Sequence, residues 1–266
     1  MADPQLTSMQ SIRRTALVLK ALSEGPSRGL RLSDVSTAVE LSKTTALRLL
    51  KALMDVGYVD YDEAAKCYRL GYELFALGIS ARRFHIIELA RPGLARLAEA
   101  TEDTVFLSVR DGDQALCADR CTGSYPIRTL TLSVGDRRPL GVGAGSLALL
   151  AFENPAEIDR ILEATRRDRL TYAGHDDETM TQLIGQTQRT GHSYNDGRIV
   201  GAMNAVGVPV LDANGRVVAA LSIAAIRERM TGPRRSELVA LLIAEAEQLG
   251  RALGSRDMER MTGGAG

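Results

Sequence analysis

The fold is decided by the stretch LSDVSTAVELSKTTALRLLKALMDV, which runs from Leu32 to Val56. Its apolar residues recur at helical spacing in two blocks, separated by a short polar break, Glu40-Leu41-Ser42. The members of the two blocks are Val35, Ala38 and Val39, followed by Leu47, Leu50, Leu53 and Met54. The pattern therefore predicts two amphipathic helices joined by a tight turn.

The second of these helices has the features of a helix that reads DNA. Ser42 suits its N-cap, because a serine hydroxyl can accept a hydrogen bond from the free N–H groups two or three residues on. The residues that follow offer hydroxyls and cations opposite a face of Leu and Met, which is typical of a helix that enters the major groove. We expect the DNA contacts to come from Ser42, Lys43, Thr44, Thr45 and Arg48.

An amphipathic helix is predicted to precede this stretch, beginning at Met9 and ending at Gly25-Pro26. Arg13 and Arg14 lie on its outer face. They are either solvated surface or contacts to DNA phosphates beside the groove. We expect residues 1–8 to be disordered.

Two runs of β-forming residues follow the stretch, over 58–61 and 67–70, and they flank a polar turn. This arrangement predicts a β-hairpin. Three helices and a hairpin make a winged helix-turn-helix domain, which we assign to residues 9–71. A further helical segment over 72–83 predicts a linker helix, with Leu74, Leu77 and Gly78 as a candidate dimer face; the linker is assigned to residues 72–84.

The composition limits how such a domain can bind DNA. The 266-residue chain has zero net charge, and residues 1–71 carry ten Lys or Arg against eight Asp or Glu. Affinity must therefore come from the local placement of charge and from pairing of copies, so a homodimer or tetramer is expected. Three cysteines, the lack of a long apolar run and the polar N-terminus predict a cytoplasmic protein with no membrane partner.

Residues 85–255 predict a second, α+β domain, and residues 256–266 a disordered tail. Strands are expected at 104–122 as a hairpin, at 127–134, and as a second hairpin within 205–226. Helices are expected at 86–102, after the glycine-rich run 141–145, at 155–165, at 176–190 and at 233–253. We expect a mostly antiparallel sheet of five or six strands with three helices on one side.

Two features of this domain predict a small-molecule pocket. On the strand 217–225, alternation gives one face of small residues that includes Ser222 and Ala224; such a face can leave room for a ligand or simply admit a closely packed helix. Ala144-Gly145-Ser146 begins a helix, whose N-terminal N–H groups can receive a carboxylate. Together they predict a small acid or a polar aromatic compound in a mostly apolar cavity.

The chain resembles the IclR family of bacterial transcription regulators over nearly its whole length. The motifs that carry the resemblance are TTALRLLKAL, YRLG, VGDRRPLGVGAGSLALLA and GHSYNDGRIVGAMNAVGVPVLDANGRVV. The resemblance implies a winged helix-turn-helix domain and a GAF-like effector-binding domain with an antiparallel sheet and flanking helices. It also implies a dimer or dimer of dimers on a palindromic double-stranded DNA operator that controls a catabolic operon, as a repressor or an activator, with a small organic acid or aromatic compound as effector.

Carried over by the resemblance, the effector site falls on eight positions. They are Ile127, Leu130, Ala144, Gly145, Asn195, Ala205, Ser222 and Ala224. The chain departs from the family pattern at Asn195 and Arg198, where acidic residues are common, so an anionic or polar neutral effector is expected. It departs again at Glu40, where a glycine is usual in the turn.

Two other classes of protein are alternatives to a ligand-responsive regulator. A small-molecule enzyme with an accessory helix-turn-helix would need a nucleophile or an acid–base pair, but His85, His175 and His192 are scattered and Ser222 has no evident partner. A structural DNA-binding protein without a ligand would not need the small-faced strand. Cys117 and Cys121 could hold a metal only with further ligands. We therefore expect no catalytic residues, no metal and no cofactor.

Overall fold

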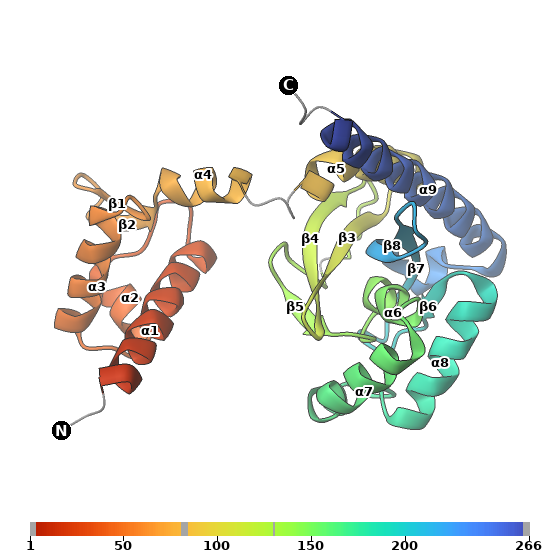
Figure 1. The fold of residues 1–266 in the computed structure, drawn as a ribbon, viewed down its shortest axis with the longest axis horizontal. Helices are drawn as coiled ribbons and strands as arrows, with labels where there is room; N and C mark the ends of the chain where they lie inside the picture. The colour runs from red at the N-terminus through yellow and green to blue at the C-terminus, as the bar shows by residue number, and fades with distance from the viewer. Residues whose placement is uncertain (1–3, 81–84, 130, 263–266) are drawn as a thin grey trace. The chain divides into compact units, whose positions relative to one another are not determined.

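The computed structural model describes residues 4–80, 85–129 and 131–262 of the chain. The residues divide into two compact units, one up to Phe84 and one from His85 onward, and each is described by itself (Figure 1).

The first unit is a winged helix-turn-helix. Its elements are α1 (Pro4–Glu24), α2 (Leu32–Ala38), α3 (Lys43–Asp55), the hairpin strands β1 (Val59–Asp62) and β2 (Cys67–Leu70), and α4 (Tyr72–Ser80). The first helix begins at Pro4, so the expectation that residues 1–8 are disordered is wrong for residues 4–8. It ends just before Gly25-Pro26, as predicted.

The core of this unit joins α1, α2 and α3 to the hairpin. Its fully or nearly buried side chains are Val18, Leu22, Val35, Val39, Leu50, Leu53, Val59 and Tyr68. Ile12 of α1 is 70% exposed, whereas Val18 and Leu22 of the same helix are buried. The bridge between Leu30 and Tyr68 ties the start of α2 to the wing.

The turn between α2 and α3 holds its shape without the usual glycine. Glu40 adopts a left-handed backbone with φ of 52°. Its neighbours fasten the turn: the Leu41 N–H donates to the Ser36 carbonyl at 3.0 Å, and the Ser36 hydroxyl donates to the Leu41 carbonyl at 2.6 Å. The departure at Glu40 therefore leaves the turn intact, at the cost of a strained conformation for a residue with a β-carbon.

The second unit is built on a six-stranded antiparallel sheet in the order β5-β4-β3-β8-β7-β6. The strands are β3 (Thr104–Asp111), β4 (Gln114–Thr122), β5 (Arg137–Pro139), β6 (Ser193–Asn195), β7 (Met203–Leu211) and β8 (Val217–Ile226). The helices are α5 (His85–Thr101), α6 (Ala144–Ala151), α7 (Pro155–Arg169), α8 (Asp177–Thr190) and α9 (Gly232–Thr262), with a short 3-10 turn, η2 (Arg227–Arg229), before α9.

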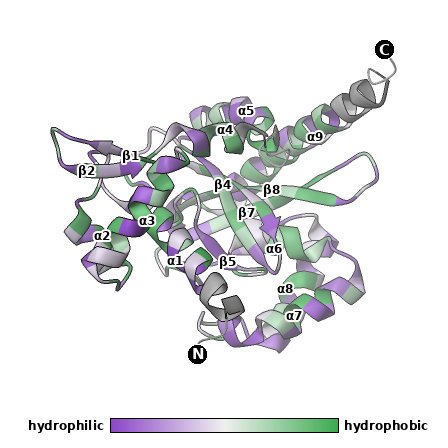
Figure 2. Ribbon diagram, turned by 60° about the vertical axis from the view of Figure 1, so that its left-hand side comes forward, coloured by the Kyte–Doolittle hydropathy of each residue, from purple (hydrophilic) through white to green (hydrophobic). Residues whose placement is uncertain are grey.

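Helices cover both faces of this sheet; the prediction of three helices on one side holds for α6, α7 and α8, but it did not place α5 and α9 on the other face. Helices α5 and α9 pack on one face, where Leu238, Leu242 and Leu249 of α9 meet the valines of β7. Helix α6 lies on the other face with α7 and α8 outside it, and all of its residues are buried. Figure 2 shows β8 as a predominantly hydrophobic strand, as expected for a strand covered on both faces.

Two predicted boundaries are also wrong. No strand forms over 127–129 or 131–134, the described part of the predicted third strand; the strand beside β4 is β5, a few residues later. Helix α9 continues to Thr262, so most of the predicted disordered tail is helical.

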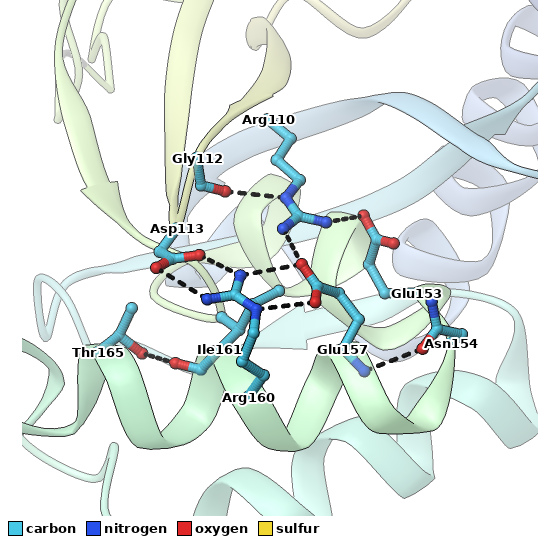
Figure 3. A network of polar contacts seen from close by, with 9 residues as sticks. All are labelled: Arg110, Gly112, Asp113, Glu153, Asn154, Glu157, Arg160, Ile161 and Thr165. Carbon is cyan, nitrogen blue, oxygen red and sulfur yellow. Dashed lines mark hydrogen bonds and ion pairs between the residues drawn. The ribbon is translucent and has the colours of Figure 1, made fainter.

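An ion-pair network fastens the β3–β4 hairpin to α7 (Figure 3). The Arg110 guanidinium bonds to Glu153 at 2.8 Å and to Glu157, and Arg160 bonds to Glu157 at 2.8 Å and to Asp113 in the hairpin turn. The bonds from Arg160 and Arg110 lower the pKa of Glu157 to about 2. This network holds α7 against the β3–β4 hairpin.

Candidate DNA-binding face and effector cavity

Helix α3 presents the predicted polar residues in two different roles. The Ser42 hydroxyl caps the helix, because it accepts from the Thr45 N–H at 3.2 Å and lies 2.9 Å from the Thr45 hydroxyl. Lys43, Thr44 and Arg48 are exposed. Ser42 and Thr45 therefore shape the helix start, while the other three are free to face outward.

The exposed face of α3 extends further than the sequence prediction. Lys51 is exposed and lies three residues after Arg48, so the two cations are neighbours on the helix surface. The recurrence of exposed positions at helical spacing after Thr44 could have identified Lys51. On α1, Arg13 and Arg14 are exposed, as expected for either of their two interpretations.

The second unit contains a cavity between the sheet and the first turn of α6. The space that the centre of a water-sized sphere can reach is about 60 Å³, and the surrounding hollow of about 630 Å³ includes space that is open to solvent. Its floor comes from β3, β4, β7 and β8, and its other walls from the residues before β5 and the loop after β6. The side chains and backbone that line it include Phe106, Ser108, Cys117, Thr129, Thr131, Leu132, Arg138, Val142, Gly143, Ile199, Val200 and Met203.

Six of the eight predicted effector positions line this cavity. They are Ala144, Gly145, Asn195, Ala205, Ser222 and Ala224. Ile127 does not, since its side chain is 52% exposed and outside the lining. The reason is that residues 127–129 form no strand; Thr129, Thr131 and Leu132 face the cavity instead. Leu130 lies outside the described residues.

Small residues let α6 approach the sheet closely. A β-carbon on Gly207 would lie 2.8 Å from the Ala144 backbone, and one on Gly145 would lie 2.9 Å from the Ser108 hydroxyl and 3.1 Å from that of Ser222. The small face of β8 thus both admits a closely packed helix and leaves room for a cavity. Ala220 packs in the core with α6, while Ser222 and Ala224 line the cavity.

Some polar groups of the cavity have protein partners, such as the Ser146 hydroxyl, which accepts from the Gly141 N–H and donates to the Pro139 carbonyl, but two buried hydroxyls have none. Ser108 and Ser222 are only 5% and 6% exposed, and neither hydroxyl has a hydrogen-bond partner in the described part of the chain. The side-chain oxygen of Asn195 accepts from the Arg198 N–H at 2.9 Å. The Ser108 and Ser222 hydroxyls lie under the first turn of α6. The N–H groups of residues 144–146 in this turn have no intrahelical acceptor, because the first helical hydrogen bond runs from the Leu147 N–H to the Gly143 carbonyl.

Two charged or reactive groups near the cavity differ from the sequence prediction. Arg198 is not in the lining: its guanidinium lies 2.9 Å from Asp196 and donates to the Gly174 carbonyl at 3.3 Å. Arg138, which the prediction missed, is in the lining, and burial lowers the pKa of its guanidinium. The adjacent arginines of the GDRRP motif on a short strand were the available signal, since one of two neighbours must face inward.

The two cysteines of the C-x3-C spacing do not converge. An irregularity in the β3–β4 pairing, where Leu107 pairs with Asp119 but Ser108 with Cys117, shifts the alternation of β4. Cys117 therefore packs beside the cavity with Phe106, while Cys121 packs against the core on the other face. Burial raises the pKa of Cys117 to about 11, so its sulfur is a neutral thiol.

The described residues lack two further kinds of feature. No group of three or more His, Cys, Asp or Glu side chains in that part of the chain is arranged to hold a metal ion. No helix within the same residues is long and apolar enough to cross a membrane.

A winged helix-turn-helix unit joined to an α+β unit whose cavity is lined by convergent polar groups is the domain pairing of a ligand-responsive DNA-binding protein. Comparison with family models agrees with this class. Residues 11–63 match the IclR helix-turn-helix domain, and residues 79–251 match the C-terminal domain of the bacterial transcriptional regulator IclR. The chain belongs to the IclR family of transcriptional regulators.

Named relatives align over almost the whole chain. The transcriptional regulator KdgR of Escherichia coli is 28% identical over 259 residues, which are 96% of this chain and 97% of that protein. The glycerol operon regulatory protein of Streptomyces coelicolor is 28% identical over 93% of this chain and 98% of its own length.

A solved structure has the same fold. The IclR homolog of Microbacterium hydrocarbonoxydans, solved in complex with 4-hydroxybenzoate, superimposes with a TM-score of 0.75 at 23% identity. The alignment covers 91% of this chain and 99% of that one.

Proposed function

We propose that this protein is a cytoplasmic regulator that binds a palindromic operator as a dimer or tetramer, and that a small effector in the cavity beside α6 changes its DNA binding. The cavity carries the proposal, because its buried hydroxyls and the first turn of α6 offer hydrogen bonds that the protein itself leaves unused.

The DNA contacts are assigned to α3. Lys43, Thr44, Arg48 and Lys51 form its exposed polar face, and Arg13 and Arg14 are assigned to phosphates outside the groove. Ser42 and Thr45 act on DNA through the shape of the helix start, where backbone N–H groups can also approach a phosphate.

Pairing of copies is supported by helix α4. Tyr72, Phe75 and Leu77 are 85%, 68% and 50% exposed, which is an unusual amount of apolar surface for one short helix. Together with Leu74 and Gly78, which are half-buried, they form the face on which we place the dimer contact. Two paired copies would present two recognition helices to the two halves of an operator.

The effector is proposed to be an organic acid or an aromatic compound of a catabolic pathway. The relative solved with 4-hydroxybenzoate, an aromatic acid, supports this choice. The alternative, an enzyme with an accessory helix-turn-helix domain, is less well supported, since the described residues that line the cavity include no histidine and no carboxylate.

The DNA-binding role is tested by substitution of Arg48 with alanine. A duplex selected from random-sequence oligonucleotides by the wild-type protein serves as the operator in a gel-shift assay. Loss of one good base contact should weaken binding by about 1 to 3 kcal/mol. Arg216→Ala, which removes the same charge from the turn between β7 and β8, is the control, and equal affinities of the two variants would overturn the assignment of Arg48.

A further inference from the structure

Arg138 is placed differently from its neighbour on the short strand β5. Arg137 is exposed and pairs with Asp111 at 2.9 Å, whereas Arg138 is half-buried and lines the cavity. Of the described residues that line the cavity, Arg138 alone carries a positive charge.

The charge of Arg138 has no direct ion pair. Its Nη2 donates to the Thr131 carbonyl at 2.7 Å, and this is the one hydrogen bond that its guanidinium makes to the described residues. No carboxylate in the described part of the chain lies within ion-pair distance of it, although, against the lowering of its pKa by burial, the charge of the nearby Asp136 acts to raise it. A partly buried cation without a direct ion pair is costly, and a bound anion would reduce that cost.

The guanidinium lies next to the first turn of α6. A β-carbon built on Gly143, the residue that precedes the helix, would be 3.6 Å from Arg138 Nη1. On the other side of the same turn, the buried hydroxyls of Ser108 and Ser222 face the cavity without partners. Cationic, N–H and O–H donors therefore surround one small space.

We propose that Arg138 is the specificity-determining residue of the cavity and that it selects effectors with a negatively charged group, held between its guanidinium and the first turn of α6. This inference rests on the proposed function and adds the charge of the effector and the residue that reads it. The apolar part of the effector would lie against Phe106, Leu132 and Met203. Arg198, which the sequence analysis named only as a departure from the family pattern, takes no part because its charge is already paired with Asp196.

The test compares acids with their uncharged amides on the full-length protein. Benzoate and adipate, each beside its amide, are titrated at constant ionic strength, and binding is followed by thermal shift and calorimetry. We expect both acids to raise the melting temperature of the wild type and the amides to have little effect. In Arg138→Gln, the dissociation constant for the acids should rise about tenfold or more, as for the loss of a charge-assisted hydrogen bond.

Two variants serve as controls. Arg137→Gln changes the adjacent, exposed arginine and should bind the acids like the wild type, and Arg138→Lys should recover part of the affinity because it keeps the charge. Equal acid binding by wild type and Arg138→Gln, equal binding of acids and amides, or no binding of either acid by the wild type would each overturn the proposal. The proposed function would survive these outcomes, because an uncharged effector could still change DNA binding. The proposed function fails if no compound that binds in the cavity changes DNA binding.

Discussion

The hydroxyl of Ser193 donates to the carbonyl oxygen of Ala144 at 2.6 Å, and it also lies 3.2 Å from the carbonyl oxygen of Gly207. This contact joins β6 to the first residue of α6, 49 positions earlier in the chain. Ser193 is fully buried, so water does not compete for the hydrogen bond. The position of the first turn of α6 over the cavity is therefore set by a side chain that does not touch the cavity itself.

Replacement of Ser193 by alanine tests this role. Loss of the hydroxyl should lower the free energy of unfolding by about 1 kcal/mol, and it should also weaken acid binding because the turn is no longer fixed. Urea denaturation and the benzoate titration measure the two effects. Ser23→Ala, which removes an exposed hydroxyl from the end of α1, should change neither. Unchanged acid binding in Ser193→Ala would show that the turn is held by packing alone.

The left-handed backbone at Glu40 predicts a gain in stability from a substitution. Glu40→Gly removes the β-carbon and its close contact with the backbone. The free energy of unfolding should rise by less than about 1 kcal/mol, because glycine also raises the entropy of the unfolded chain. Ala52→Gly, at an exposed site inside α3, should instead destabilise by about 1 kcal/mol. Thermal denaturation measures both, and a loss of stability in Glu40→Gly would mean that the side chain contributes more than its strain costs.

The network on α7 predicts a dependence of stability on acid pH. Bonds from Arg160 and Arg110 lower the pKa of Glu157 from 4.5 to about 2 in the folded protein. A carboxyl group with a lowered folded-state pKa stabilises the fold above its unfolded pKa and loses that contribution as pH falls through the folded value. The wild type should therefore lose stability between pH 4.5 and about 2 more steeply than Glu157→Gln does. Parallel urea midpoints for the two proteins over this interval would contradict the prediction.

Much of the fold follows from local patterns in the sequence. The two helices of the Leu32 to Val56 stretch, the wing, and the hairpin with the Asp-Gly turn are all set by residues close in the chain, and they form where the periodicity predicts them. The strand predicted over 127–134 fails because alternation of β-branched residues does not require a strand. There, Thr129, Thr131 and Leu132 turn toward the cavity, and β5 pairs with β4 instead.

The cavity was less predictable, because it depends on how distant strands align. Phe106 pairs with Ser222, and this register brings Ser108 under α6 beside the predicted serine. The position of Ser108 beside Ser222 follows only from the order of the strands, which puts β3 next to β8. Arg198 and not Arg138 was named from the sequence, and what distinguishes the two is that Arg198 has a carboxylate partner whereas Arg138 lines the cavity.

The central claim is that occupation of the cavity changes DNA binding, and the most direct measurement is operator affinity with and without ligand in a variant whose cavity is filled. Ala205→Leu is preferred to Ser222→Leu, because Ser222 lies so close to Gly145 that a larger side chain there would displace α6. Fluorescence anisotropy with the selected duplex and the acid of greatest thermal shift should give a ligand-dependent dissociation constant for the wild type. Ala205→Leu should bind the duplex like the ligand-free wild type and should not respond to the acid. An equal response of the two proteins would contradict the account.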